Sequence, residues 1–305
     1  MSPLPTNTAN TTSNTAPAAP RPADLGTLLV SCVDRRGLVA ALAQVLAGHG
    51  ANIIDSDQHA DPSAGQFFQR IRFDASELTS DRATLLGGIE EVTARFAMKW
   101  RLCWGEEKKR VAVFVSRYDH CLIDLLTRWH SHEFDCEIPV IISNHEDLRP
   151  VADYFHVPFR VFPITPETKR AQEDAECALL EEAGVGLVVL ARYMQILSEQ
   201  FIARFPERII NIHHSFLPAF KGGRPYQQAH ARGVKLVGAT AHYATANLDE
   251  GPIIEQDVVR CSHRDQPPDL ARKGSDLERS VLARAVRWHL EDRVLVYGNK
   301  TVVFA

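Results

Sequence analysis

The chain has 305 residues, of which 45% are hydrophobic, and a formal net charge of −4. On a prior of roughly 150 residues per domain, this length suggests two domains. The hydrophobic content is enough for ordinary buried cores and excludes disorder of the whole chain. The slightly negative charge argues against a general surface for nucleic acid or anionic membrane, and no apolar run approaches the ~20 residues that would span a bilayer.

The cysteines and the N-terminal segment both predict a cytoplasmic protein. Six scattered cysteines without CxxC spacing indicate reduced packing residues rather than disulfides or a metal site. Residues 1–24 consist almost entirely of Ser, Pro, Thr, Asn and Ala, which predicts a disordered tail. The tail lacks the basic start and apolar stretch of a secretory signal. It also lacks the arginines of a mitochondrial presequence, because the first arginine is Arg21.

Residues 25–105 predict a small ferredoxin-like domain. Hydrophobic patterns and turn residues indicate, in order, a strand at 27–33, a helix at 38–48, strands beginning at 52 and 66, a helix at 85–98 and a strand at 99–104. A βαββαβ order in fewer than about 85 residues is typical of this fold. A charged junction at 106–110 separates it from the rest of the chain.

Residues 106–305 predict a doubly wound, mostly parallel α/β sheet. Short apolar strands are expected at 111–115, 138–142, 159–162, 186–190 and 209–212. Helices are expected between them at 121–132, 148–155, 168–183 and 198–205. This alternation is typical of a parallel sheet. Two strands at 234–243 and 252–259 should extend the sheet, followed by a helix at 268–292 and a hairpin at 294–304.

Three polar residues mark a candidate active site in this second domain. Asn211 and His213 fall where the strand at 209–212 ends, and Asp249 lies in the loop between the two last sheet strands. Active sites of open α/β sheets lie beyond the carboxyl ends of the strands, so these side chains are expected to converge. An amide can hold an oxyanion, an imidazole can move a proton, and a carboxylate can orient both the imidazole and a water. Together they could catalyse attack on a formyl carbon.

Two other interpretations of these residues are less consistent with the pattern. A lone histidine is more often a structural residue, but here a polar cluster interrupts an apolar strand at the end of a sheet. His213, His214, His242 and Asp249 could in principle bind zinc, yet their spacing matches no common zinc pattern. The sequence therefore predicts neither a metal nor another cofactor.

Three segments carry a resemblance to a known family. Residues 211–222 read NIHHSFLPAFKG, residues 238–243 read GATAHY, and residues 248–254 read LDEGPII. They resemble the signatures of the folate-dependent formyltransferase family. From Leu28 onward, the chain is most similar to the hydrolytic branch of that family, the formyltetrahydrofolate deformylases.

The resemblance implies a reaction and roles for the three residues. Water would hydrolyse 10-formyltetrahydrofolate to tetrahydrofolate and formate, which feeds purine synthesis and balances the one-carbon folate pool. His213 would transfer the proton, Asn211 would hold the oxyanion, and Asp249 would position water and tune His213. The folate is the substrate, and no cofactor is implied.

The resemblance also implies a slot for the folate. Met194, Gln195, Ile196 and Leu197 align with the loop that lines this slot in the family. His242, Tyr243 and Leu248 would contribute from the other side. Ordinary packing at a helix start remains an alternative for Met194, Ile196 and Leu197, as does support of Asp249 or simple packing for His242.

Transfer of the formyl group to an acceptor such as glycinamide ribonucleotide is the main alternative. The turn after the first strand of the second domain, residues 116–120, lacks glycine, and Asp119 would repel the acceptor's phosphate, although Arg117 is nearby. Water is therefore the expected nucleophile. Formylation of tRNA is disfavoured by the negative charge and the missing nucleic-acid domain. A catalytically silent folate or amino-acid sensor would not need all three polar residues.

The N-terminal domain resembles an ACT domain in residues 34–38 (DRRGL) and 50–53 (GANI). This resemblance implies a homo-oligomer and an amino-acid effector linked to one-carbon metabolism, bound at a subunit interface. The candidate effector residues are Asp34, Gly37, Leu38, Asn52 and Ile53. In the alternative interpretation, Asp34 caps a helix and Asn52 is a turn residue. The expected partners are thus the folate substrate, water and this effector, with no nucleic acid and no membrane.

Overall fold

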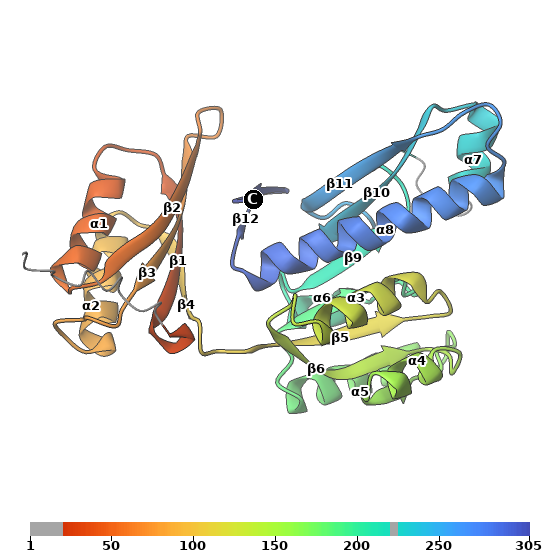
Figure 1. Cartoon of the computed structure of the whole chain (residues 1–305), viewed down its shortest axis with the longest axis horizontal. Helices are drawn as coiled ribbons and strands as arrows, with labels where there is room; N and C mark the ends of the chain where they lie inside the picture. Colours follow the sequence, from red (N-terminus) through yellow and green to blue (C-terminus); the bar gives the residue numbers. More distant parts are fainter. Residues whose placement is uncertain (1–20, 220–224) are drawn as a thin grey trace, which may run out of the picture.

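The computed structural model describes residues 21–219 and 225–305, which form two domains lying side by side (Figure 1). Of the predicted disordered tail, residues 1–20 lie outside the described residues. Its end is ordered instead, because Pro22–Asp24 form a short 3-10 helix, η1. The last three residues of the 211–222 segment also lie outside the described part of the chain.

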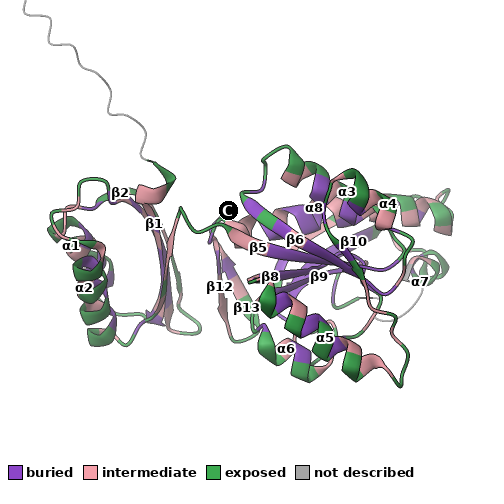
Figure 2. Cartoon of the chain, turned by 90° about the horizontal axis from the view of Figure 1, so that it is seen from below, coloured by how far each residue is buried: buried purple, intermediate pink, exposed green. Residues whose placement is uncertain are grey.

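The N-terminal domain has the predicted βαββαβ order. Its strands are β1 (Leu25–Val33), β2 (Asn52–Asp61), β3 (Gln66–Asp74) and β4 (Lys99–Trp104), arranged as an antiparallel sheet in the order β2-β3-β1-β4. Its helices are α1 (Leu38–Gly48) and α2 (Arg82–Arg95). Both helices cover one face of the sheet, where Leu28, Leu42 and Leu85 are fully buried in one apolar cluster (Figure 2). The predicted ferredoxin-like domain is therefore confirmed.

The start of α1 differs from the alternative interpretation of Asp34 as a helix cap. Gly37 occupies the N-cap position with φ 91°, a left-handed conformation that glycine adopts without steric cost, and no side chain caps the helix. The backbone N–H of Asp34 instead donates to the carbonyl of Gly65. Asp34 is thus an exposed residue of the β1–α1 connection.

The second domain contains a seven-stranded sheet in the order β11-β10-β9-β8-β5-β6-β7. Its strands are β5 (Lys109–Val115), β6 (Cys136–Ser143), β7 (Phe159–Val161), β8 (Leu187–Leu190), β9 (Ile209–His213), β10 (Leu236–Tyr243) and β11 (Ile253–Arg260). Strands β5 to β9 are parallel, whereas β10 and β11 run antiparallel to their neighbours. The predicted mostly parallel α/β sheet is confirmed.

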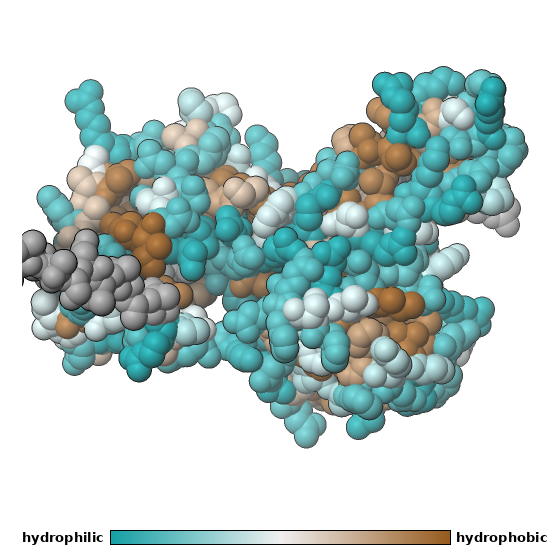
Figure 3. All heavy atoms as spheres, viewed as in Figure 1, coloured by the Kyte–Doolittle hydropathy of each residue, from teal (hydrophilic) through white to brown (hydrophobic). Residues whose placement is uncertain are grey.

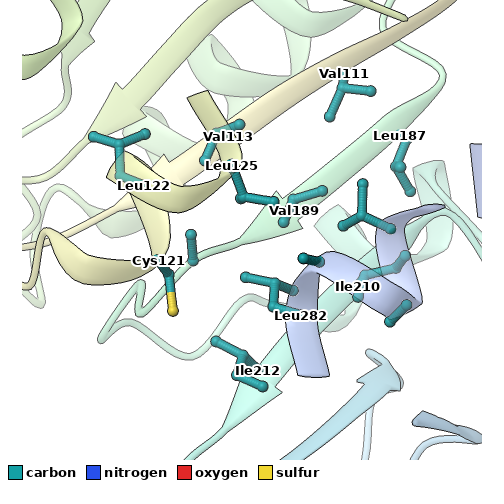
Figure 4. Packing of buried hydrophobic residues seen from close by; sticks show 14 of the residues in the cluster. Val111, Val113, Cys121, Leu122, Leu125, Leu187, Val189, Ile210, Ile212 and Leu282 are labelled. Carbon is teal, nitrogen blue, oxygen red and sulfur yellow. The ribbon is translucent and has the colours of Figure 1, made fainter. Parts of the chain in front are cut away.

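Helices cover both faces of this sheet. They are α3 (His120–His130), α4 (Arg149–Tyr154), α5 (Lys169–Glu182), α6 (Glu199–Arg204), α7 (Pro225–Arg232) and α8 (Pro267–Leu290). On one face, side chains such as Val113, Val189 and Ile210 pack against Leu125 of α3 and Leu282 of α8 (Figure 4). On the other face, a second apolar cluster includes residues of α5 and α6. Burial on both faces explains why the parallel strands are continuous apolar runs.

The C-terminal hairpin connects the two domains. Its strands β12 (Val294–Tyr297) and β13 (Lys300–Val303) lie between the two larger sheets (Figure 2). Val302 and Phe304 are buried against Leu29 and Phe68 on the face of the N-terminal sheet that the helices leave open. Nearby, the buried Arg70 donates to the backbone carbonyls that follow α8. The hairpin thus completes the core of the N-terminal domain.

One face of the molecule is mostly polar. On the face shown in Figure 3, hydrophilic residues dominate and hydrophobic ones gather in a few groups on each domain. In the described residues, no helix is both long and apolar enough to cross a membrane.

Candidate active site

A cavity of about 540 Å³ lies at the carboxyl ends of β5, β8 and β9, where active sites of open α/β sheets are found. It is lined by all three predicted catalytic residues and by most of the predicted folate residues. These are Asn211, His213, Asp249, Met194, Gln195, Ile196, Leu197, His242 and Leu248. Side chains far apart in the sequence therefore meet at one site, as was expected for residues beside the carboxyl ends of the strands.

Strand alternation places the side chains of β9. Ile210 and Ile212 point into the core beneath α8, so Asn211 and His213 share the opposite face and line the cavity. Asn211 is the direct cross-strand partner of His242 on β10, and its Nδ2 lies 3.2 Å from His242 Nε2. The β9–β10 register thus builds the polar floor of the site.

His242 determines the orientation of the Asn211 amide. Its Nδ1 lies 3.0 Å from the carbonyl oxygen of Tyr243, which can only accept, so Nδ1 carries the proton. In the neutral ring, Nε2 then accepts a hydrogen bond from the NH2 group of Asn211. The second N–H of that NH2 group can donate to an oxygen in the cavity, as an oxyanion holder must.

Asp249 approaches both histidines from the β10–β11 loop. Its Oδ1 lies 3.2 Å from His213 Nδ1 and 3.7 Å from His242 Nε2. Burial opposes ionisation of this carboxyl group. The hydrogen bond from Nδ1–H of His213 outweighs that cost and holds the pKa of Asp249 well below its usual range. Asp249 is therefore a carboxylate at neutral pH.

The backbone around Asp249 is tightly constrained. Asp249 itself has φ 56°, in the left-handed region that Asp and Asn tolerate better than most residues. Two residues later, a Cβ on Gly251 would lie only 1.7 Å from the carbonyl oxygen of Tyr243. Only glycine fits this close approach, which folds the loop back onto β10 and brings Asp249 to His213.

His213 has the geometry of a proton-transfer residue. Its side chain is 5% exposed, and its Nδ1 faces Asp249. Its Nε2 is buried and has no hydrogen-bond partner among the described residues. A buried ring nitrogen without a partner is costly, which is consistent with a partner supplied by substrate or water.

Hydrogen bonds from neighbouring elements hold the predicted folate loop, residues 194–197, in place. The Oγ of Ser116 accepts from the backbone N–H of Met194 (2.9 Å) and donates to Asn144. Lys169 of α5 donates to the carbonyl of Ile196. Met194 and Ile196 are 52% and 59% exposed and precede α6, so the alternative of packing at a helix start is wrong for them.

Glu176 supports the same loop, and its burial gives a pH-dependent prediction. The carboxyl group is fully buried and accepts from Tyr193 Oη (3.3 Å), and burial raises its pKa to about 8. In the unfolded chain the pKa returns to about 4.3. Unfolding therefore releases a proton between these values, and the free energy of unfolding should fall as pH rises, by at most about 1.4 kcal/mol per pH unit.

Glu176→Gln is expected to remove this slope while keeping the shape of the side chain. The free energy of unfolding in urea, measured at pH 6 and pH 8, tests the expectation. Glu182→Gln, at an exposed position of the same helix, is the matched control. Equal slopes in the Glu176→Gln variant and the wild-type protein would show that Glu176 is ionised in the folded state.

Tyr243 is not in the cavity, contrary to the prediction. It follows His242 directly in β10, so the two side chains point to opposite faces of the sheet. Its ring is buried beneath α8, and its Oη lies 2.8 Å from Nδ1 of His289. Tyr243 therefore anchors β10 to α8 rather than contacting the substrate.

The predicted effector residues do not form one site within a single chain. At one end of β3, Asp74 pairs with Asn52 of β2 and with Leu25 of β1. At the other end of β3, Gln66 pairs with Val33 of β1, next to Asp34. Asn52 therefore lies at the opposite end of the sheet from Asp34, roughly 30 Å away for a nine-residue strand. Gly37 and Ile53 lie near Asp34 and Asn52 respectively, and Leu38 is buried in the core. One small ligand cannot touch both ends of one domain.

One side of the cavity, lined by Arg192 and Glu278, was not predicted from the sequence. Arg192, just after β8, lies with its Nε 3.4 Å from Oε2 of Glu278 on α8, and both residues are at least nine-tenths buried. Glu278 also contacts His120 Nε2 (2.7 Å) and Tyr226 Oη (2.8 Å). Arg192 directly follows the end of an apolar strand, so the rule that found His213 could have found it. Glu278 lies in the middle of α8, where no comparable sequence pattern marks it.

This charged side of the cavity is poorly suited to a metal ion. Donor atoms of His120, Cys121 and Glu278 lie within 4.8 Å of one another. However, burial raises the pKa of the Cys121 thiol well above its usual value, which disfavours the thiolate that a metal needs. The cation of Arg192 already neutralises Glu278. A further positive charge would be repelled here.

Comparison with known proteins agrees with this architecture. The sequence model of the formyl transferase family matches residues 109–286, and that of the ACT domain matches residues 26–85. Formyltetrahydrofolate deformylases from Synechocystis and Bacillus subtilis are 56% and 50% identical, over 92% of this chain and 98% and 94% of theirs. The crystal structure of a formyltetrahydrofolate deformylase from Pseudomonas syringae matches with a TM-score of 0.90 and 47% identity, covering 92% of this chain and 94% of that one.

The fold and site thus define a formyl transferase-type enzyme domain joined to an ACT domain. At this identity over almost the whole described chain, the protein belongs to the formyltetrahydrofolate deformylase family.

Proposed function

We propose that the protein hydrolyses 10-formyltetrahydrofolate to tetrahydrofolate and formate. The observation that carries this proposal is the contact between His213 and Asp249 beside the amide of Asn211. This arrangement provides a proton acceptor, a carboxylate that orients it, and an oxyanion donor within one cavity. The names of the relatives at 50–56% identity support the same activity.

The first step is attack by water on the formyl carbon. Asp249 accepts from Nδ1–H of His213, which leaves the lone pair on Nε2 facing the reaction. Nε2 takes a proton from water as the water oxygen bonds to the formyl carbon. The electron pair of the carbonyl bond moves to the oxygen, and the amide N–H of Asn211 stabilises the resulting oxyanion.

The second step breaks the bond between the formyl carbon and N10. The oxyanion re-forms the carbonyl, the bonding pair passes to N10, and the imidazolium of His213 returns the proton to that nitrogen. Asp249 stabilises the positive ring between the two steps. Tetrahydrofolate and formic acid are the products, and the acid ionises to formate. The residues at 194–197 and Leu248 would hold the pterin through backbone groups and apolar contacts.

Formyl transfer to a phosphorylated acceptor is less consistent with the charges around the site. Ser116 and His120, in the turn where a phosphate would bind, are already engaged by Asn144 and Glu278. Asp119, in the same turn, carries a negative charge that would repel a phosphate. Water is the nucleophile that needs no such site.

Incubation of the purified protein with 10-formyltetrahydrofolate and no acceptor tests the proposal directly. Formate and tetrahydrofolate should appear in equal amounts. No formate alone, but formyl transfer once glycinamide ribonucleotide is added, would refute the hydrolase assignment.

We further propose that the protein is a cytoplasmic homo-oligomer, that its formate supplies purine synthesis, and that an amino acid regulates it. Because Asp34 and Asn52 lie at opposite ends of one sheet, an effector could contact both only between two copies of the chain. Light scattering would measure the number of copies. If saturating glycine and methionine leave both the rate and the melting temperature unchanged, those two effectors are excluded.

A further inference from the structure

His213 is stacked against a second histidine. The rings of His213 and His214 are nearly parallel, with an interplanar angle of 20° and centroids 5.0 Å apart. His214 is partly buried and also lines the cavity. A charge on His214 would therefore act directly on the ring that the proposed reaction protonates.

Arg192 determines which nitrogen of the neutral His214 ring carries the proton. Its Nη1 lies within hydrogen-bond distance of Nδ1 of His214. A guanidinium has only donors and stays charged in proteins, so Nδ1 of His214 must be the acceptor and carries no proton. The proton of the neutral ring is then on Nε2.

Arg192 is itself fixed by its surroundings. Its Nε lies 3.4 Å from Glu278, and its guanidinium carbon lies 4.9 Å above the ring of Tyr118. Its backbone has φ 64°, a conformation that costs free energy for a residue other than glycine and is held by the surrounding structure. This network keeps the cation against His214.

The other groups around His214 explain the direction of its titration. Burial, Arg192 and His213 lower the pKa of His214 to about 4, while Glu278 on α8 and Asp249 in the β10–β11 loop act in the opposite direction. Tyr226 of α7 presents its ring 6.3 Å away. Of the two opposing carboxylates, Glu278 is already paired with Arg192. His214 is therefore neutral throughout the physiological pH range.

We propose that Arg192 is a positioning residue for the hydrolysis, because it holds His214 as a neutral ring against His213. The proton taken from water then rests on His213 alone. A charged His214 would repel that proton and weaken the step that His213 performs. This inference rests on the proposed function for its kinetic consequence, whereas the neutral state of His214 can be measured independently.

Arg192→Gln is the informative change. It removes the cation and leaves Glu278 facing His214, so the pKa of His214 should rise from about 4 towards the ordinary histidine value of about 6.5, while burial and His213 still act to lower it. We expect kcat for formate release to fall between pH 8 and pH 6 by up to about fourfold more than in the wild-type protein, which is the limit for a group that titrates near 6.5. KM for the folate should change less than about twofold. Arg192→Lys retains a cation and should restore most of the activity at pH 6.

Two further variants separate this role from damage to the fold. Arg192→Gln combined with Glu278→Gln also removes the buried carboxylate that would be left unpaired. In this variant kcat should still fall at acid pH, but by less than in Arg192→Gln alone. Arg192→Gln combined with His214→Gln has no ring that can become charged at position 214, so its rate should fall at acid pH only as much as that of the wild-type protein, in which His213 must be neutral to act. A fall at acid pH as large as that of Arg192→Gln alone would overturn the proposal.

NMR titration of the His214 ring provides the readout that does not depend on activity. In the wild-type protein the ring should not titrate above about pH 5, and in Arg192→Gln its titration midpoint should move up by at least about one pH unit, towards 6.5. A wild-type His214 that titrates near 6.5 would refute the inference even if formate is released. No formate from the wild-type protein, with His214 neutral, would instead refute the proposed function.

Discussion

His213→Gln is expected to lower kcat for formate release by roughly 10² to 10⁴-fold, because the variant loses the group that accepts and returns the proton. Glutamine retains polarity and similar length but does not take up a proton near neutral pH. Its effect on folate affinity should be small, because the proposed folate slot lies at 194–197 and 248. Formate release and folate binding, measured on the same preparation, test the expectation.

His263→Gln is the matched control for this prediction. His263 is exposed in the chain after β11 and does not line the cavity, so its variant should retain wild-type kcat. Retained folate binding without turnover in His213→Gln would also exclude a silent folate sensor. Wild-type turnover in His213→Gln would show that another group moves the proton.

The catalytic residues could be predicted because they follow local rules. An apolar strand that ends in Asn211 and His213 marks the carboxyl edge of a parallel sheet. β10 runs antiparallel to β9, so the loop that carries Asp249 begins beside the start of β9 and reaches His213 only because it folds back. The hydrophobic periods of 2 and 3.6 residues likewise indicated the helices and strands within a few residues. Tyr243 was misplaced even though strand alternation separates it from His242.

The features that were not predicted depend on contacts between distant segments. Arg192 and Glu278 are 86 positions apart, and the arginine and the helix that carries the glutamate meet only when the sheet is assembled. The separation of Asp34 from Asn52 follows from the register of β3 with two neighbours, which the hydrophobic pattern of either strand does not encode. The docking of the C-terminal hairpin on the N-terminal sheet is a contact of the same kind.

Asp249→Asn is expected to lower kcat by a similar factor, roughly 10² to 10⁴-fold, for a different reason. The carboxylate accepts from Nδ1–H of His213, which fixes the proton of the neutral ring on Nδ1 and stabilises the ring once Nε2 is protonated. The amide of asparagine can accept from Nδ1–H only in one of its two orientations, and it has no charge with which to stabilise the protonated ring. Asparagine is the appropriate substitution because it also tolerates the left-handed backbone at φ 56°, so the loop should keep its shape.

The pH dependence distinguishes the role of Asp249 from a structural one. Because its pKa is held well below the usual carboxyl range, Asp249 stays ionised in the wild-type protein as pH falls to about 5, and its protonation should not limit kcat there. In Asp249→Asn the rate should therefore be low across pH 5 to 9 without a change in thermal stability larger than that of Asp153→Asn, an exposed control on α4. A rate that recovers at low pH would show instead that Asp249 serves mainly to keep His213 protonated. The carboxylate would then act through its charge in the resting enzyme rather than through the imidazolium formed during the reaction.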